Sequence, residues 1–189
     1  MPLPTRPARP TALPVALLLA TALMTAGLTG CSALSPFNTC DDTEARLKDL
    51  RSQPILNSTP EGATASKGLD SVDARCIDDT GDAWLYAERV YAFPGSRQEV
   101  VDFYRTAAKA DGWYLPPAPP ALGTPETAAG LCFTRGGDGD ALMLTLRFTT
   151  AGDLKIEHDY DAGPEFDSGS GFEMKVGSET DGAKTGCWD

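Results

Sequence analysis

The chain contains a single histidine, His158, and histidine is the side chain best suited to acid–base chemistry near neutral pH. A catalytic histidine also needs a nucleophile and an orienting acid within hydrogen-bond reach. The sequence carries no Gly-x-Ser-x-Gly segment or comparable nucleophile signature. We therefore expect His158 to be a packed or edge residue of the fold, and we predict no catalytic residue.

Acidic side chains are plentiful, with 27 Asp and Glu against 16 Lys and Arg. Paired carboxylates can hydrolyse glycosidic bonds, but the sequence does not select a pair. Two acidic runs, Asp78–Asp82 and Asp138–Asp140, offer the oxygen ligands that Ca²⁺ requires. Neither run has the twelve-residue EF-hand form with its closing glutamate, and turn chemistry explains both. We therefore predict no metal site and no cofactor.

The first 30 residues have the layout of an export signal. Arg6 and Arg9 lie in a proline-rich start without acidic residues, and an apolar stretch of mostly alanine and leucine follows over residues 13 to 24. This stretch is shorter than the roughly 20 apolar residues that a membrane span needs. It ends in small residues and a cysteine, in the sequence Leu28-Thr29-Gly30-Cys31.

This quartet resembles the lipobox of bacterial lipoprotein precursors, at all four positions. The resemblance implies that residues 1–30 are a signal peptide that is removed and that the Cys31 sulfur receives a diacylglyceryl group. Two acyl chains suffice for stable anchoring, where one does not. The expected organisation is a lipidated tether over residues 31–39 and a single extracytoplasmic domain over residues 40–189. The resemblance places the protein at the cell membrane, lipid-anchored on its extracytoplasmic face.

Beyond Cys31, four cysteines remain, an even number in a chain expected to be exported: Cys40, Cys76, Cys132 and Cys187. No two of them stand two to four residues apart, which argues against a zinc site, and no Cys-x-x-Cys segment supports redox catalysis. Two disulfides are therefore expected, and the sequence leaves three pairings open. We favour Cys40 with Cys76 and Cys132 with Cys187, because each pair closes a terminal part onto the middle of the chain.

The chain beyond residue 30 is strongly acidic. Residues 1–30 contain two arginines and no acid, so the remainder carries 14 Lys and Arg against 27 Asp and Glu, a formal charge near −13. Binding to a nucleic-acid backbone depends on clustered Lys and Arg, so we predict no nucleic-acid partner. The charge favours solubility and leaves cationic partners open.

Two helices and a strand are predicted in the first part of the domain. Residues 39 to 52 predict a short polar helix, and residues 53 to 71 are mostly turn formers that predict a loop. Residues 83 to 93, AWLYAERVYAF, predict a strand that stops at a Pro-Gly turn. Ser96 and Glu99 then form a capping box, and the helix that follows carries an apolar stripe at spacings of three and four residues.

Residues 94 to 113, PGSRQEVVDFYRTAAKADGW, resemble a pattern found in many exported proteins and lipoproteins of high-GC bacteria. That pattern consists of a strand, Pro-Gly, a helix with Phe-Tyr-Arg and a closing Gly-Trp. Those proteins are largely without assigned function, so the resemblance implies a fold and no activity. We expect Tyr104 and Trp113 to lie in the core or at its edge rather than to line a binding surface with Arg105.

The second part of the domain predicts mostly strands. The proline-rich residues 115 to 130 are expected to cross the surface from the helix back to the sheet. Residues 131 to 135 and 141 to 150 flank a turn of glycine and aspartate and predict a hairpin. Residues 154 to 160 predict a third strand of an antiparallel meander, with His158 among its apolar residues. Residues 171 to 176, GFEMKV, are a candidate edge strand.

These elements predict an α+β fold, with one main helix packed on a four- or five-stranded, mainly antiparallel sheet that disulfides pin. The function expected is that of a membrane-anchored cell-envelope lipoprotein: a non-catalytic binding or accessory module for an unknown protein or small ligand. A carboxylate-dependent hydrolase acting on envelope polymer and a structural envelope lipoprotein are the alternatives.

Overall fold

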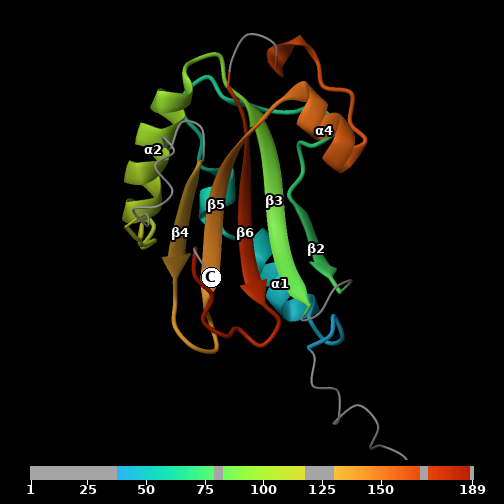
Figure 1. Cartoon of the computed structure of the whole chain (residues 1–189), viewed down its shortest axis with the longest axis vertical. Coiled ribbons are helices and arrows are strands. Elements are labelled where there is room, and N and C mark those ends of the chain that lie inside the picture. The colour runs from blue at the N-terminus through green and yellow to red at the C-terminus, as the bar shows by residue number, and fades with distance from the viewer. Residues whose placement is uncertain (1–37, 79–82, 118–129, 167–169, 188–189) are drawn as a thin grey trace, which may run out of the picture. The chain divides into compact units, whose positions relative to one another are not determined.

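A six-stranded sheet forms the centre of the fold, and its paired strands all run antiparallel (Figure 1). The structure is a computed structural model that describes residues 38–78, 83–117, 130–166 and 170–187. These residues belong to one compact unit, Phe37–Asp189. The predicted α+β class with a mainly antiparallel sheet is confirmed, although the described residues contain three α-helices rather than one main helix, and the sheet has six strands rather than four or five.

Two short strands share one edge of the sheet. β1 (Thr64–Ala65) and β2 (Asp73–Ile77) both pair with β3 (Trp84–Ala92), at opposite ends of it. On the other side of β3 the order is β6 (Gly171–Glu179), β5 (Leu142–Thr149) and β4 (Leu131–Arg135). The predicted strand over residues 83 to 93 and the predicted hairpin of β4 with β5 are therefore confirmed.

β6 is the central strand of the sheet, so the prediction of an edge strand over residues 171 to 176 is wrong. Charged residues such as Glu173 and Lys175 are common on solvated edge strands, which is why the sequence favours an edge position. Both lie on one face of the sheet, where they form ion pairs, while Phe172 and Met174 on the other face are fully buried. The side-chain period of two lets a single strand serve an apolar face and a charged face.

The apolar face of the sheet packs on helices α1 (Glu44–Arg51) and α2 (Arg97–Ala110). Both helices were predicted, and α2 begins with the predicted capping box, in which Ser96 Oγ accepts from the Glu99 N–H. Tyr104 and Trp113 are buried, as expected. The Tyr104 hydroxyl donates to the Ser58 carbonyl at 2.6 Å, and burial raises the pKa of this tyrosine.

The segment predicted as a loop over residues 53 to 71 contains regular structure. The 3₁₀ helix η2 (Pro54–Asn57) buries Ile55 and Leu56 in the main core, and β1 follows it. The many turn formers hide these elements because each is only one turn or two residues long. The prediction of an unstructured connection was therefore incomplete.

Residues 151 to 158 form helix α4 (Ala151–His158), so the predicted third strand over residues 154 to 160 is wrong, and with it the meander. A second capping box starts this helix. Thr150 Oγ1 accepts from the Asp153 N–H at 3.2 Å, and the Asp153 carboxylate accepts from the Thr150 N–H at 2.8 Å. Gly152, beside this aspartate, favours a turn, and this hides the start of the helix in the sequence.

Helix geometry separates the residues that the strand prediction placed on one face. Residues two apart point in nearly opposite directions on a helix, so Leu154 is buried against Val90 while Ile156 is 85% exposed. A short 3₁₀ helix, η4 (Pro164–Phe166), adds Phe166 to this small second core. Figure 1 shows α4 on the near side of the sheet, opposite α1.

Two disulfides tie the ends of the domain to the sheet. Cys40 pairs with Cys76 of β2, and Cys132 of β4 pairs with Cys187, with Cα atoms 5.8 and 5.7 Å apart. The favoured pairing is therefore confirmed. Among the described residues, no helix is long and apolar enough to cross a bilayer.

Candidate functional site

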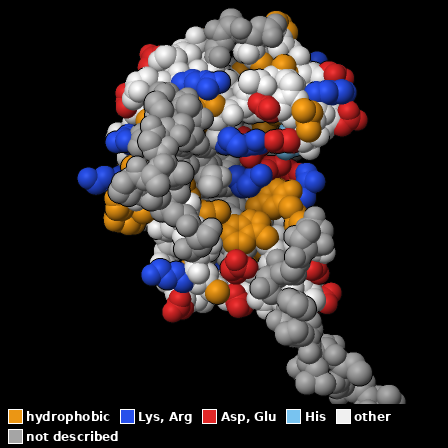
Figure 2. All heavy atoms as spheres, viewed as in Figure 1, with side chains coloured by type: hydrophobic (Ala, Val, Ile, Leu, Met, Phe, Trp, Pro, Cys, Tyr) orange, Lys and Arg blue, Asp and Glu red, His pale blue; other side chains and the backbone are white. Residues whose placement is uncertain are grey.

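A pocket of about 330 Å³ lies between α4 and the β2–β3 edge of the sheet. Its walls combine apolar and charged residues: Leu69, Ser71, Asp73, Arg75, Glu88, Arg89, Val90, Ile156, Glu157, His158 and Asp159. Figure 2 shows acidic and basic side chains gathered side by side on this face of the molecule, with a hydrophobic patch below them. The pocket is thus a mixed site, with apolar walls and a charged floor.

Two carboxylates of neighbouring strands form the buried part of the site. Glu88 of β3 and Glu173 of β6 are only 5% and 3% exposed, and Lys175 Nζ lies 2.8 Å from Glu88 Oε2 and 3.1 Å from Glu173 Oε1. The sheet register brings these three side chains together. Glu88 stands opposite Lys175, and the next residue of β3 on the same face, Val90, stands opposite Glu173. Burial alone would lower the pKa of Lys175, but the two carboxylates outweigh it and raise this pKa.

Arg147 of β5 supplies the second positive charge. It stands directly opposite Glu173 in the sheet and lies 3.1 Å from that carboxylate. It also donates through both terminal nitrogens to Glu157 of α4, in a fork-to-fork arrangement. This hydrogen bonding raises the pKa of Arg147 and holds the pKa of the Glu157 carboxyl below its usual range.

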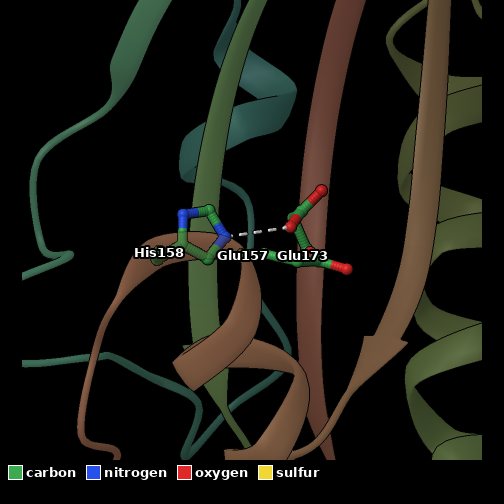
Figure 3. A group of neighbouring side chains, drawn as sticks. All are labelled: Glu157, His158 and Glu173. Atoms are coloured by element: carbon green, nitrogen blue, oxygen red, sulfur yellow. Dashed lines mark ion pairs between the residues drawn. The ribbon is translucent and has the colours of Figure 1, made fainter.

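His158, the last residue of α4, lies between the two buried carboxylates. Its Nε2 is 3.6 Å from Glu173 Oε2 and its Nδ1 is 3.8 Å from Glu88 Oε1, both beyond hydrogen-bond distance. Figure 3 shows the imidazole directed at the Glu173 carboxylate. In the described part of the structure Nε2 is buried without a hydrogen-bond partner. The only histidine is therefore a half-buried member of a charge network rather than part of an apolar face.

The group Glu157, His158 and Glu173 has the donor types of a metal site, with ligand atoms within 4.8 Å of one another. Arg147, however, donates to both carboxylates at this point. A metal ion would have to displace the guanidinium from two partners. Protein cations thus fill the role that a metal ion would have, and the arrangement is better suited to hydrogen bonding a ligand than to ligating a metal.

Sequence reasoning missed Glu88, Glu157 and Glu173 as members of a site. Two signals indicate the elements that carry Glu157 and Glu173, whereas no local signal brings Glu88 to them. The Thr150–Asp153 capping box predicts a helix, which carries Glu157 and His158 to the sheet, and charged residues alternating with apolar ones in residues 171 to 176 indicate a strand with one charged face.

The other candidate residues fall outside this site. Asp138 and Asp140 are exposed in the β4–β5 turn, where the Asp140 carboxylate accepts from the Gly137 N–H at 2.7 Å, as turn chemistry predicts. Asp78 is exposed, and the rest of the Asp78–Asp82 run lies outside the described residues. So do Cys31, residues 1–30 and most of the proline-rich segment.

Comparison of the chain with protein-family models, with curated proteins and with solved structures finds no match.

Proposed function

We propose that this chain is a lipid-anchored, extracytoplasmic binding module that holds a small ligand in the pocket between α4 and the sheet. The observation that carries the proposal is the pocket itself, in which the buried Glu88 and the neighbouring His158 meet apolar walls. Pockets of about 300 to 1,000 Å³ with a few convergent polar groups are typical of small-molecule sites. At about 330 Å³, this pocket suits a ligand at the small end of that range.

The energetic cost of the charge network supports a functional role. Taking carboxylates and cations out of water is expensive, and well-packed apolar residues in their place are often as stable or more so. Glu88 and Glu173 are almost fully buried, on a sheet face where Val90 and Ala92 show that apolar packing is available. Retaining charges at such a place indicates that they interact with something other than the fold.

The walls of the pocket offer apolar contact near these charges. Leu69 and Val90 line it from the sheet side, and Ile156 lines it from α4. Ile156 is 85% exposed and stands among polar residues of α4. A ligand with a short apolar part would cover it.

The anchor of the proposed module is Cys31. The lipobox resemblance supports loss of residues 1–30 and lipidation of this cysteine, which would leave only the tether, residues 31–39, between lipid and domain. The partners of the proposed module are the membrane, through this lipid, and a small ligand in the pocket. The acidic charge of the chain argues against nucleic acid.

Binding is favoured over hydrolysis because the carboxylates near the pocket are already paired. Lys175 contacts both Glu88 and Glu173, and Arg147 contacts Glu157. A carboxylate-dependent hydrolase needs a protonated acid and a free base or nucleophile on either side of its substrate. Among the described residues, the acids of this site have the charge partners of a binding network instead.

Native mass spectrometry tests whether the pocket holds a ligand. We would incubate the detergent-extracted full chain with the small-molecule fraction of a bacterial envelope. We expect a non-covalent adduct that disappears on denaturation and is absent from Ser71→Trp, in which an indole fills the pocket. Thr106→Trp places the same side chain on the exposed side of α2 and should keep the adduct. The same adduct on the Ser71→Trp variant would refute the proposed site.

Intact mass tests the anchor separately. The protein extracted from membranes of a bacterial host should lack residues 1–30 and carry added diacylglyceryl mass. Cys31→Ala should remain unmodified and should leave the detergent phase on phase separation. A wild-type chain without added lipid mass would contradict the anchoring part of the proposal and leave the pocket part standing.

A further inference from the structure

The chain between β5 and β6 leaves the sheet and returns to it at one point. Thr149, the last residue of β5, stands directly opposite Gly171, the first residue of β6. α4 and η4 lie in this connection, and we call its residues 150–166 the α4 segment. Because the two ends of the connection meet at one pair of strand residues, the α4 segment can leave the sheet face without breaking the pairing of the strands.

The backbone of the α4 segment is hydrogen-bonded to itself. Beyond the bonds inside the helix, the Tyr160 N–H donates to the Leu154 carbonyl at 3.2 Å. The Phe166 N–H donates to the Gly163 carbonyl, also at 3.2 Å. Among the described residues, no backbone hydrogen bond ties the segment to the sheet. Because a helix of eight residues is marginal in water by itself, α4 depends on side-chain contacts with the rest of the fold.

Polar side-chain contacts hold the α4 segment at two places. Arg147 of β5 donates to Glu157 through both terminal nitrogens. The Tyr160 hydroxyl donates to the Lys67 carbonyl in the connection between β1 and β2. The Tyr160 ring also lies against Gly68, where a Cβ atom would stand 3.3 Å from it. The segment is thus fastened to two parts of the fold that are far apart in the sequence.

The apolar contacts of the α4 segment form a core of their own. Leu154 and Phe166 pack with Val90 and Ala92 of β3, and this cluster is separate from the main core on the other face of the sheet. Detaching the segment would expose this small cluster and leave the main core closed. Such a local opening requires much less free energy than global unfolding.

Resting on the proposed function of the pocket, we infer that the α4 segment is a cover that detaches from the sheet as one unit and so opens and closes the ligand site. Residues 156 to 159 form one wall of the pocket, so detachment removes that wall. A ligand in the pocket contacts both the cover and the sheet, and therefore favours the closed state by mass action. The closed state binds the ligand, and opening admits and releases it.

Thiol labelling at two positions of β3 tests for this opening. Ala92 belongs to the cluster under the cover and does not line the pocket, whereas Ala87 lies in the main core on the other face, and the two are 3% and 0% exposed. We would treat the full chain carrying Ala92→Cys or Ala87→Cys, in detergent micelles, with methyl methanethiosulfonate and locate the label by peptide mass. We expect Ala92→Cys to react at least about a hundredfold faster, because Ala87→Cys requires global unfolding.

Second substitutions separate the two kinds of opening. Ser96→Ala removes the cap of α2, which packs on the main core, and should speed labelling of Ala87→Cys about fivefold while leaving Ala92→Cys unchanged. Glu157→Gln and Tyr160→Phe loosen the cover at its two fastenings, and each should speed labelling of Ala92→Cys about threefold to fivefold. Tyr114→Phe removes the hydroxyl of an exposed tyrosine outside the segment and should have no effect.

Three results would overturn the inference. One is equal labelling of Ala92→Cys and Ala87→Cys once their urea stabilities are taken into account. Another is equal acceleration of both by Ser96→Ala, because Ala92 is then reached through global unfolding. The third is an effect of Glu157→Gln without one of Tyr160→Phe, which would indicate fraying of α4 rather than movement of a unit.

Native mass spectrometry keeps this inference apart from the proposed function. A ligand adduct that Ser71→Trp abolishes, together with equal labelling at the two positions, would refute the cover and support the pocket. Fast labelling of Ala92→Cys in a chain that forms no adduct would refute the pocket as a ligand site and support the detachment of the segment.

Discussion

Replacing Arg147 by methionine tests whether the charge network is a real feature of the folded protein. Arg147 contacts Glu173, which is 3% exposed, and Glu157, which is 39% exposed. Methionine keeps much of the apolar stem of the arginine, so the substitution mainly removes charge and hydrogen bonds. The variant should therefore measure the cost of leaving Glu173 with Lys175 as its only cation.

The magnitude follows from how deeply the partners are buried. Breaking a fully buried ion pair costs roughly 3 to 5 kcal/mol, and an exposed pair contributes about 0.2 to 1 kcal/mol. Arg147 is 42% exposed, and Lys175 still neutralises part of the Glu173 charge, so solvent and the remaining cation both reduce the loss. We expect the free energy of unfolding to fall by about 2 kcal/mol, which lies between these limits.

The assay is urea unfolding followed by circular dichroism, with two matched variants. Arg75→Met removes a cation from an exposed pair with Asp73 and should cost under about 1 kcal/mol. Adding Glu173→Leu to Arg147→Met should recover most of the lost stability, because no charge is then buried without its partner. An Arg147→Met variant as stable as Arg75→Met would refute the reasoning, as would a double variant that is no more stable than Arg147→Met alone.

Three further predictions concern the elements around the site. Thr150→Ala removes the α4 cap at a cost of about 1 kcal/mol and should speed amide exchange in α4 and weaken ligand binding in the pocket, whereas Ser96→Ala removes the α2 cap and should change only stability. The folded-state pKa of Glu157 is lowered, so its contribution to stability is complete above its unfolded pKa of about 4.3 and is lost as the pH falls through the folded pKa. Urea midpoints should therefore fall less between pH 6 and pH 3 in Arg147→Met than in wild type. On thiol titration, the denatured, unreduced domain should show no free thiol among its four paired cysteines. The double variant with Cys132→Ser and Cys187→Ser removes a disulfide that joins residues 55 apart, and this should lower the free energy of unfolding by about 4 kcal/mol.

Local signals in the sequence predicted the elements that depend on neighbouring residues. The capping box at Ser96 and the stripe of apolar residues after it specify α2, because both act within one or two turns. The aromatic and β-branched residues before the Pro-Gly turn specify β3 in the same way. The disulfide pairing was a choice among three, and the fold confirms it.

The errors have one local cause and one long-range cause. Residues 154 to 160 alternate between apolar and polar as a strand does, and the cap at Thr150 turns them into a helix whose single buried residue is Leu154. The charges of β6 look like those of an edge strand until Arg147 and Glu88 are known to be their partners. Pairings across more than 25 residues leave no local trace, so the site could not be assembled from sequence alone.

The two faces of the sheet explain why the site lies where it does. On one face, α1 and α2 cover the apolar side chains of β3 and β6, so that face is closed. On the other face, the eight-residue α4 is the covering helix, and it contributes one buried side chain, Leu154. Because α4 is too short to cover this face with apolar contacts, the sheet can keep charges there, and the end of α4 that carries Glu157 and His158 lies against them.

The Cys40–Cys76 disulfide connects this site to the segment that follows the proposed anchor. Cys76 lies on β2 next to Arg75, which lines the pocket, and its partner Cys40 is nine residues after Cys31 in the chain. β2 is an edge strand held by hydrogen bonds on one side only, so in the absence of a crosslink it is among the first parts of a sheet to fray. The Cys40–Cys76 disulfide ties this pocket wall to the segment that follows the proposed lipidation site. The Cys132–Cys187 disulfide instead holds β4 at the opposite edge of the sheet, away from the pocket. Loss of the first crosslink should therefore weaken ligand binding, while loss of the second should lower stability and leave the affinity unchanged.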